Sequence, residues 1–494
     1  MAMYEGKNRL AALWRSFCAA SLIDKCDLLS FLCLCAFVFD CSFSGGGHYL
    51  TIGSLTPRML FGFFALLFSL PKLMRGFRGY ITNPILLMFL AFLAYLAVCA
   101  VRGYLADNKM SVLLNDVKGF AWLLLVPVFI AAVDTRARFS KLLSCILVGA
   151  VIQAGIALYI NTVCSTVSEG IMIFYHPIYN TQLGTVGNIS GKIYRVFMRS
   201  CPYMVIACGI AFFRQVQAEK IRLRYVAAIG VCLCGILMSF TRSLYGCTAV
   251  VALCAIVAVV WFYRSKWKKM LKFGVITAVV TFCMVFAMEF MFSASYFNFA
   301  LSRTIGTEPK QSLAVSLRNT WECYKFEVMN GEQTPGKDLT EELEQNQREE
   351  LVEQQDYIDV TEESDNLRQV TMSELGALIR VNPVFGNGLG AFAPSRDTGK
   401  NLPNDGLDEY FYLDVLARMG MVGLVLYMLP FAYLMVICLK ERRKLAAFPG
   451  GVAIICGTFG FWAITWFNPW MNAVLGITGY ALCCTVPQVI RTDR

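Results

Sequence analysis

Arginines recur beside the apolar segments of this chain, where a charged side chain is costly unless it has a task. Arg242 stands in the turn SFTRSLYG at 239–246, and Arg368 stands shortly before the motif NPVFGNGLGAF at 382–392. A guanidinium group binds phosphate oxygens through two parallel hydrogen bonds, so these residues predict a site for a phosphate-linked substrate. The other arginines of this kind are Arg195, Arg199, Arg303, Arg318 and Arg380. For any one of them, anchoring a helix end to lipid headgroups is the alternative interpretation.

Three carboxylates, Asp405, Asp408 and Glu409, precede one of the apolar segments. A carboxylate can take the proton from an attacking hydroxyl, whereas a pyrophosphate leaving group that arginines hold needs no acid. We therefore predict Glu409 as a general base, with Asp408 and Asp405 as neighbours able to substitute for it. The alternative is a carboxylate that only stabilises the start of its helix through the helix dipole.

A glycine-rich loop precedes these carboxylates in the sequence, and an expected ion pair follows them. Arg418 follows Asp414 by four positions, so the two share one helix face and are predicted to form a structural ion pair. Gly386, Gly388 and Gly390 predict a tight, exposed backbone that could approach a ligand, and Gly388 and Gly390 are therefore substrate-binding candidates. No strand precedes these glycines, so they do not imply a dinucleotide site.

The elements that must position these residues are membrane helices. Of the 494 residues 57% are hydrophobic and only 16% are charged, and the mean hydropathy is +0.56. A soluble domain is about 45–50% apolar and about 25% charged, so a water-soluble enzyme is not expected. The net charge of +10 comes from short basic loops between apolar runs, which argues against nucleic-acid binding. Because the 20 cysteines lie mostly in apolar runs and only two histidines are present, we expect no disulfide framework, metal site or cofactor.

Twelve apolar runs approach the roughly 20 residues that a membrane helix needs. They cover 27–43, 58–74, 83–102, 116–133, 139–161, 195–214, 222–240, 243–263, 271–293, 409–438, 449–467 and 471–489. Lysine and arginine concentrate in alternate short loops, and the positive-inside rule then places both termini in the cytoplasm. The sequence therefore predicts an all-α, polytopic integral membrane protein.

We expect the chain to divide into three parts. Residues 1–293 form an N-terminal membrane region of nine helices, and 409–494 form a C-terminal region of three. Between them, 294–408 is predicted to be a large extracytoplasmic loop before the tenth span. Its stretch 327–365 is strongly acidic, with only Lys337 and Arg348 opposing, and predicts a solvated insertion.

The order and spacing of these motifs resemble the O-antigen ligase and O-antigen polymerase superfamily of membrane glycosyltransferases. The resemblance rests on Arg368, the motif at 382–392, YFYLDVLARMGMVG at 410–423 and the arginine turn at 239–246. The number of spans and the large outer loop before the antepenultimate span agree with it.

This resemblance implies a GT-C-like fold and a metal-independent, inverting glycosyltransferase in the bacterial cytoplasmic (inner) membrane. The implied donor is an undecaprenyl-pyrophosphate-linked glycan repeat unit of an O-antigen or exopolysaccharide. The implied acceptor is another lipid-linked glycan or the lipid A core of lipopolysaccharide, and a chain-length regulator protein is a further implied partner. By position, Arg242 and Arg368 match the family's pyrophosphate-binding arginines, with Arg318 as a second candidate for the loop arginine. Glu409 and Tyr410 stand where ligases carry His-Asn, which favours polymerase over ligase.

Two other classes of function stay open at this point. A twelve-span transporter or lipid-linked oligosaccharide flippase would share the composition, although the hydropathy shows no repeat of two halves. A membrane scaffold without chemistry would share it too, but it would not explain arginines at the outer helix ends.

Overall fold

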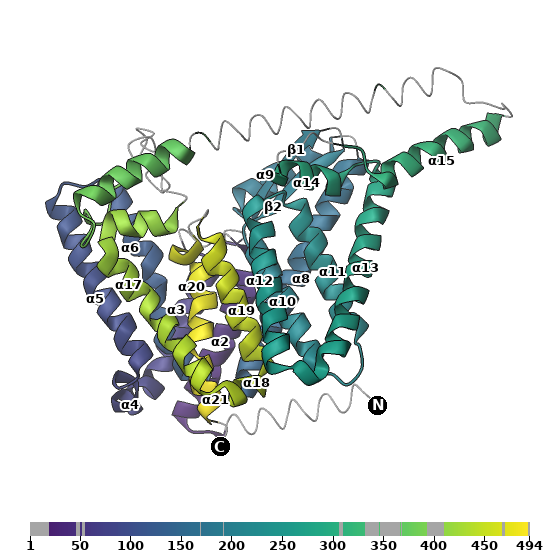
Figure 1. Cartoon of the computed structure of the whole chain (residues 1–494). Helices are drawn as coiled ribbons and strands as arrows, with labels where there is room; N and C mark the ends of the chain where they lie inside the picture. The colour runs from purple at the N-terminus through teal and green to yellow at the C-terminus, as the bar shows by residue number, and fades with distance from the viewer. Residues whose placement is uncertain are drawn as a thin grey trace.

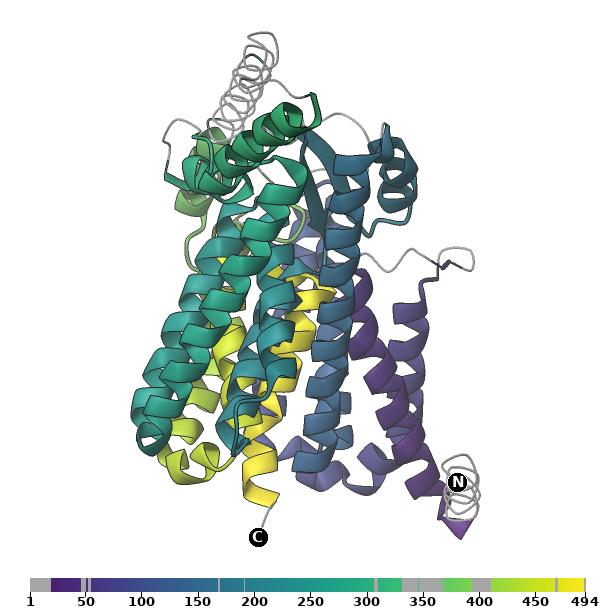
Figure 2. The ribbon, with the colours of Figure 1, turned by 90° about the vertical axis from the view of Figure 1, so that its right-hand side faces the viewer.

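The computed structural model describes residues 19–45, 50–51, 55–167, 169–190, 192–305, 310–330, 345, 366, 368–392, 410–466 and 470–492. Within these residues the protein is a bundle of α-helices with one small two-stranded sheet (Figures 1 and 2). Nine helical segments of the described chain are long and apolar enough to cross a bilayer. By helix length and hydropathy, this is a multi-pass membrane protein.

Each of the twelve predicted runs contains helix. The first five runs correspond to α2 (Leu22–Ser44), α3 (Pro57–Arg75), α5 (Pro84–Leu105), the consecutive α6 (Met110–Ala121), η1 (Trp122–Leu125) and α7 (Val126–Ala132), and α8 (Arg136–Thr166). The others correspond to α10 (Cys201–Gln217), α11 (Leu223–Met238), α12 (Arg242–Phe262), α13 (Trp267–Phe292), α17 (Phe411–Lys440), α19 (Pro449–Ile464), and the pair α20 (Val474–Cys484) and α21 (Val486–Thr492). Of these, α11 and α19 are apolar but have only 16 residues each.

Several of these helices begin at a residue whose side chain caps them. Ser21 accepts a hydrogen bond from the Asp24 N–H at the start of α2, and Thr135 accepts one from Arg138 at the start of α8. Thr56 caps α3 in the same way, with Pro57 as the first helical residue. A cap satisfies a backbone N–H that has no partner within the helix, which fixes where each helix starts.

The bundle has two distinct ends (Figure 1). At the lower end the short elements α4 (Phe77–Ile81), η2 (Arg264–Lys266) and α18 (Arg442–Ala446) join the long helices and carry arginines and lysines. We call this the basic end; α2 begins there and α21 ends there. At the upper end, which we call the hairpin end, lie α9 (Gly170–Asn180), β1 (Gly184–Ser190), β2 (Ile193–Met198), α14 (Tyr296–Ile305) and α15 (Leu313–Asn330).

The hairpin end corrects one predicted element. The sixth apolar run was expected to be helical from residue 195, with Arg195 and Arg199 one turn apart. Instead β1 and β2 pair antiparallel, with Gly187 opposite Arg195, and α10 begins only at Cys201. Arg195 is therefore a strand residue and Arg199 lies in the turn before α10. The apolar residues of β2 pack against the bundle as a strand, which a short apolar run alone does not distinguish from a helix.

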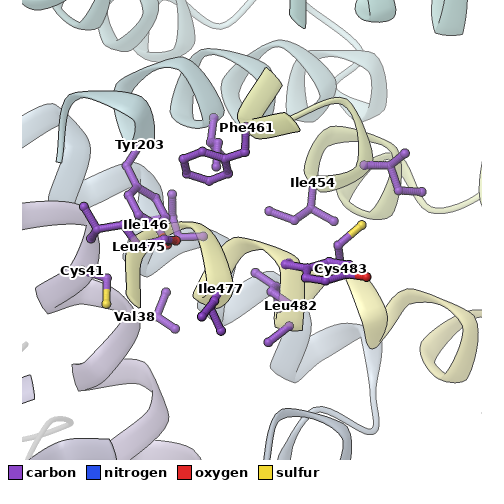
Figure 3. Packing of buried hydrophobic residues seen from close by; sticks show 14 of the residues in the cluster. Val38, Cys41, Ile146, Tyr203, Ile454, Phe461, Leu475, Ile477, Leu482 and Cys483 are labelled. Atoms are coloured by element: carbon purple, nitrogen blue, oxygen red, sulfur yellow. The ribbon is translucent and has the colours of Figure 1, made fainter. Parts of the chain in front are cut away.

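The core lies where α2, α8, α10, α19 and α20 meet (Figure 3). Tyr203 is fully buried there, donates a hydrogen bond to the Leu475 carbonyl at 2.8 Å and packs edge-on against Phe461 at a centroid separation of 5.6 Å. A charged pair is buried beside it: Arg58 Nε lies 2.8 Å from Asp40 Oδ2, and both side chains are almost fully covered. Because a bilayer offers no water to a polar group, each polar side chain at this depth needs a protein partner.

Candidate functional site: an arginine cluster at the hairpin end

The predicted arginine turn lies between α11 and α12. Helix α11 ends at Met238, and α12 starts at Arg242 after only three residues. Within this turn Phe240 has a φ of 44°, which is in the left-handed region. Such a conformation costs about 1–3 kcal/mol in a residue other than glycine. Packing stabilises this conformation here, because the Phe240 ring is completely buried against Phe299, with ring centroids 5.1 Å apart.

Two further arginines converge on the carbonyls of this turn. Arg195 Nε, from β2, donates to the Ser239 carbonyl at 3.1 Å. Arg303 Nη1, from α14, donates to the Phe240 carbonyl. These carbonyls close the C-terminal end of α11, where the helix dipole favours cations. Three segments far apart in sequence therefore bring Arg195, Arg242 and Arg303 to one turn, and we call these three residues the arginine cluster.

Arg242 differs from the other two in its place on a helix. It is the first residue of α12, with Thr241 before it, and it is half-buried. A cation at a helix N-terminus is at the unfavourable end of the dipole, whereas an anion would be stabilised there. Helix stability alone therefore does not explain an arginine at this position.

The cluster can bind an anion of high charge density. Guanidinium groups remain charged at any physiological pH, and their planar forks match phosphate oxygens. Tyr245, one turn into α12, donates its hydroxyl hydrogen to the Leu237 carbonyl at 3.0 Å and so fixes the start of α12 against the end of α11. A metal ion would instead need several His, Cys, Asp or Glu ligands. The described residues contain no group of three or more such side chains placed to hold one.

The other predicted arginines have different partners. Arg199 Nη1 donates to Gln182 Oε1 at 3.2 Å in the turn before α10, where desolvation lowers the pKa of its guanidinium from the usual value. Arg318, on α15, forms an ion pair with Glu322 at 2.8 Å and donates to the carbonyls of Phe290 and Met291. This contact explains how α15 attaches to the end of α13.

Arg368 opens the helix 368–381, which lies on the opposite side of the hairpin end, above α5 and α6 (Figure 1). Figure 1 shows this helix well separated from α15, which carries Arg318, and from β2, which carries Arg195. Arg368 therefore does not join Arg318 or the arginine cluster. Asp405, Asp408 and Glu409 lie outside the described residues, as does most of the acidic insertion 327–365.

The glycine motif has a different setting from the one expected. Gly386, Gly388 and Gly390 all have positive φ, of 70°, 87° and 84°, but they are buried rather than exposed. A Cβ on Gly388 would collide with the backbone of Gly103 in α5, and a Cβ on Gly386 would collide with the backbone of Arg418 and Gly420. The close approach that these glycines permit is thus to α5 and α17, and the expectation of an exposed backbone is wrong.

The loop 382–392 repairs a break in α17. Gly420 has φ 66° and ψ −171°, which interrupts the helical hydrogen bonds. The loop supplies replacements: Gly388 N–H donates to the Arg418 carbonyl at 2.9 Å, and Met421 N–H donates to the Pro383 carbonyl at 2.9 Å. The Leu389 N–H also donates to the Cys99 carbonyl of α5 at 3.0 Å. Broken helices are tolerated at membrane depth only where such partners exist.

Arg418 lies at the centre of this junction and is 3% exposed. Its Nη2 lies 2.8 Å from Asp414 Oδ1, which confirms the predicted pair. Sequence reasoning missed its second partner, Asp116 of α6, to which Nη1 is also bound. Asp116 in turn accepts from the Gly390 N–H at 2.9 Å, and Arg418 Nε donates to the Ala391 carbonyl at 2.7 Å. We call Asp116, Asp414, Arg418 and the loop 382–392 the glycine-loop junction.

Comparison with known proteins adds no identity: no protein-family model matches this chain, and no curated protein matches it either.

Proposed function

We propose that this protein is a membrane glycosyltransferase that transfers an undecaprenyl-pyrophosphate-linked glycan on the outer face of the cytoplasmic membrane. The observation that carries the proposal is the arginine cluster. Arg195, Arg242 and Arg303 come from three separate elements and meet at a single turn, at the end of the bundle opposite the basic loops.

The distribution of charge supports the orientation that this proposal needs. Short loops rich in lysine and arginine lie on the cytoplasmic side of membrane proteins. If the basic end is cytoplasmic, the hairpin end faces outward and the arginine cluster is at the outer surface. Arginines there are not accounted for by the positive-inside rule, and a pyrophosphate is a ligand of matching charge.

The reaction follows from the chemistry of such a donor. The acceptor hydroxyl oxygen attacks the anomeric carbon, and the bond from that carbon to the pyrophosphate oxygen breaks with inversion. The arginines stabilise the charge that develops on the leaving pyrophosphate, and Glu409 is the proposed base that receives the hydroxyl proton. Because Glu409 and Tyr410 replace the His-Asn of the ligases, polymerisation of repeat units is preferred to ligation onto a lipid A core.

A deletion strain separates the candidate functions by the glycans that it accumulates. Electrophoresis of its surface glycan should show single repeat units on the lipid anchor if the protein is a polymerase. A ligase predicts an anchor without repeats, together with retained lipid-linked polymer. Lipid-linked units confined to the inner face would instead identify a flippase. Unchanged glycans of every kind would contradict the proposal.

Complementing the deletion with Arg242→Ala and Arg303→Ala tests the site itself. Both variants should reach the membrane in normal amounts and fail to restore the product. The matched control is Arg224→Ala, because Arg224 is an exposed arginine at the basic end that donates to the hydroxyl of the neighbouring Tyr225 at 3.2 Å and lies over its ring.

A further inference from the structure

A cavity of about 560 Å³ lies at the basic end, far from the arginine cluster. Its walls come from α4 and the start of α5, and from the parts of α17, α20 and α21 at the same end (Figure 1). Sites for small molecules have volumes of about 300–1,000 Å³, so this cavity is large enough for a ligand. We call it the basic-end cavity.

The apolar part of the wall comes from the long helices. Ile85 of α5, Ile437 of α17 and Cys484 of α20 line the cavity and are 4%, 4% and 1% exposed. Toward the middle of the bundle, Leu87 of α5 and Val436 of α17 are 49% and 47% exposed, on helices that are long and apolar enough to cross a bilayer. Burying hydrocarbon against such a wall is favourable. The wall therefore fits a lipid chain better than it fits a soluble anion.

The polar part of the wall offers hydrogen-bond donors. Arg491 is exposed, and no hydrogen bond or ion pair joins its guanidinium to another described residue. Asn83 accepts from the Ile85 N–H at 3.0 Å through its side-chain oxygen, which leaves its amide hydrogens to donate. Burial raises the pKa of Tyr80 above its usual value, so its hydroxyl keeps its proton and can also donate. None of the described residues that line the cavity is Asp or Glu, so this part of the wall favours an anion with several acceptor oxygens.

We propose that the basic-end cavity binds one anionic phospholipid from the membrane leaflet at that end. The phosphate oxygens accept from Arg491, Tyr80 and Asn83, and the start of the acyl chains packs against the apolar wall. Basic pockets between membrane helices on the cytoplasmic side bind anionic headgroups in this way. A free phosphate would use the donors but leave the apolar wall uncovered, which is why a lipid is the expected occupant.

A lipid in this cavity would join two regions of the bundle. Helices α4 and α5 belong to the N-terminal membrane region, whereas α17, α20 and α21 belong to the C-terminal one. A ligand that binds only the folded protein stabilises it, so the bound lipid should raise the thermal unfolding temperature. The inference does not depend on the proposed transfer reaction, because the arginine cluster lies at the opposite end of the bundle.

Binding of short-chain lipids to the delipidated full-length protein in neutral detergent tests the proposal. The probe is dioctanoyl phosphatidylglycerol, titrated below its critical micelle concentration and followed by calorimetry. Dioctanoyl phosphatidylcholine has the same chains but adds a cation near Arg491, and it should bind about tenfold more weakly. Inorganic phosphate lacks the chains and should give no saturable binding. Only phosphatidylglycerol should raise the unfolding temperature appreciably.

Two variants test the cavity itself. Arg491→Gln removes a charge-assisted hydrogen bond and should raise the Kd of phosphatidylglycerol about tenfold. Gly79→Leu should abolish binding by filling space, because Gly79 lines the cavity within α4 and a Cβ there meets nothing within 4 Å. The lipid-free Gly79→Leu protein should unfold at the wild-type temperature or slightly above it, which excludes misfolding as the cause. Arg264→Gln is the matched control, because Arg264 is exposed at the basic end and does not line the cavity.

Several results would overturn the proposal. These are no saturable binding of phosphatidylglycerol, equal Kd values for the two lipids, or a wild-type Kd in either Arg491→Gln or Gly79→Leu. Inorganic phosphate that binds as tightly as phosphatidylglycerol would assign the donors to a free anion and reject a lipid. An equal loss of affinity in Arg264→Gln would show that general positive charge at this end attracts the lipid, and would reject a specific cavity.

Discussion

The proposed role of Arg242 depends on the planar shape of its guanidinium group. Replacing it with lysine keeps one positive charge but removes the planar fork that binds two phosphate oxygens at once. One lost charge-assisted hydrogen bond is worth about 1.5–3 kcal/mol. We therefore expect Arg242→Lys to lower transfer about tenfold to a hundredfold at normal membrane abundance. The measurement is polymer yield per unit of protein, and a lysine variant with wild-type yield would exclude a bidentate role.

Arg418 gives a prediction on stability. Asp116→Ala would leave this buried guanidinium with Asp414 as its remaining described carboxylate partner. Breaking a buried ion pair costs about 3–5 kcal/mol, and we expect a marked fall in thermal unfolding temperature in detergent. Glu441→Ala is the contrast, because the Lys444–Glu441 pair of 3.0 Å is largely exposed, with side-chain exposures of 48% and 28%. Such a surface pair contributes about 0–1 kcal/mol, so equal losses in both variants would refute this account of the junction.

At the residue scale, the sequence predicts one of the two carboxylate partners of Arg418 and does not predict the other. Asp414 lies one turn from Arg418, and that spacing alone predicts the pair. Asp116 lies 302 residues away and stands at the start of an apolar run, where it reads as an ordinary helix end. Arg195, Arg242 and Arg303 could likewise be named as candidates from their positions. Their meeting at residues 239–241 depends on how β2 and α14 fold over the turn, which no local pattern encodes.

At the scale of elements, the glycine loop should tolerate no side chain where it crosses α5. Gly388→Ala would need a left-handed backbone at φ 87° and would force its Cβ into Gly103. Strain and overpacking together cost about 2 kcal/mol or more, so we expect less folded protein in the membrane. Immunoblotting and thermal unfolding measure this.

Gly376→Ala is the matched control, since a Cβ there meets nothing within 4 Å and the residue lies inside the helix 368–381. Alanine is favoured over glycine within a helix by about 0.5–1 kcal/mol. This variant should therefore be as stable as the wild type or slightly more stable. A harmless Gly388→Ala would show that the loop does not pack as described.

The long helices were predictable from the sequence, and the small elements were not. A run of about 20 apolar residues has few alternatives to a helix in a bilayer, because every backbone group must be paired within the segment. The strand β2 has only six residues and joins directly to the turn before α10, so its apolar side chains merge into the run that follows. The break in α17 was hidden for a similar reason, since Gly420 sits in an otherwise uninterrupted apolar pattern.

At the scale of the whole molecule, the two ends of the bundle should lie on opposite sides of the membrane. Asn188, exposed on β1 at the hairpin end, and Lys268, exposed on α13 at the basic end, are suitable for single cysteine substitutions. An impermeant thiol reagent should label Asn188→Cys in intact cells and Lys268→Cys only after permeabilisation. Wild-type protein measures the background from native cysteines. The reverse pattern would place the arginine cluster in the cytoplasm and remove the basis of the proposed reaction.

The repair of α17 by the loop 382–392 also dictates an order of assembly during synthesis. The loop leaves the ribosome after α5 and α6 but before the residues whose backbone it pairs, the last of which are Met421 and Val422. It can dock on Cys99 and Asp116 at once, but its bonds to 417–422 must wait for α17 to emerge. Without the loop, the N–H groups of Met421 and Val422 in the second half of α17 would lack these carbonyl partners. We therefore expect the loop bound to α5 to act as a template on which the tenth apolar run completes its entry into the bilayer.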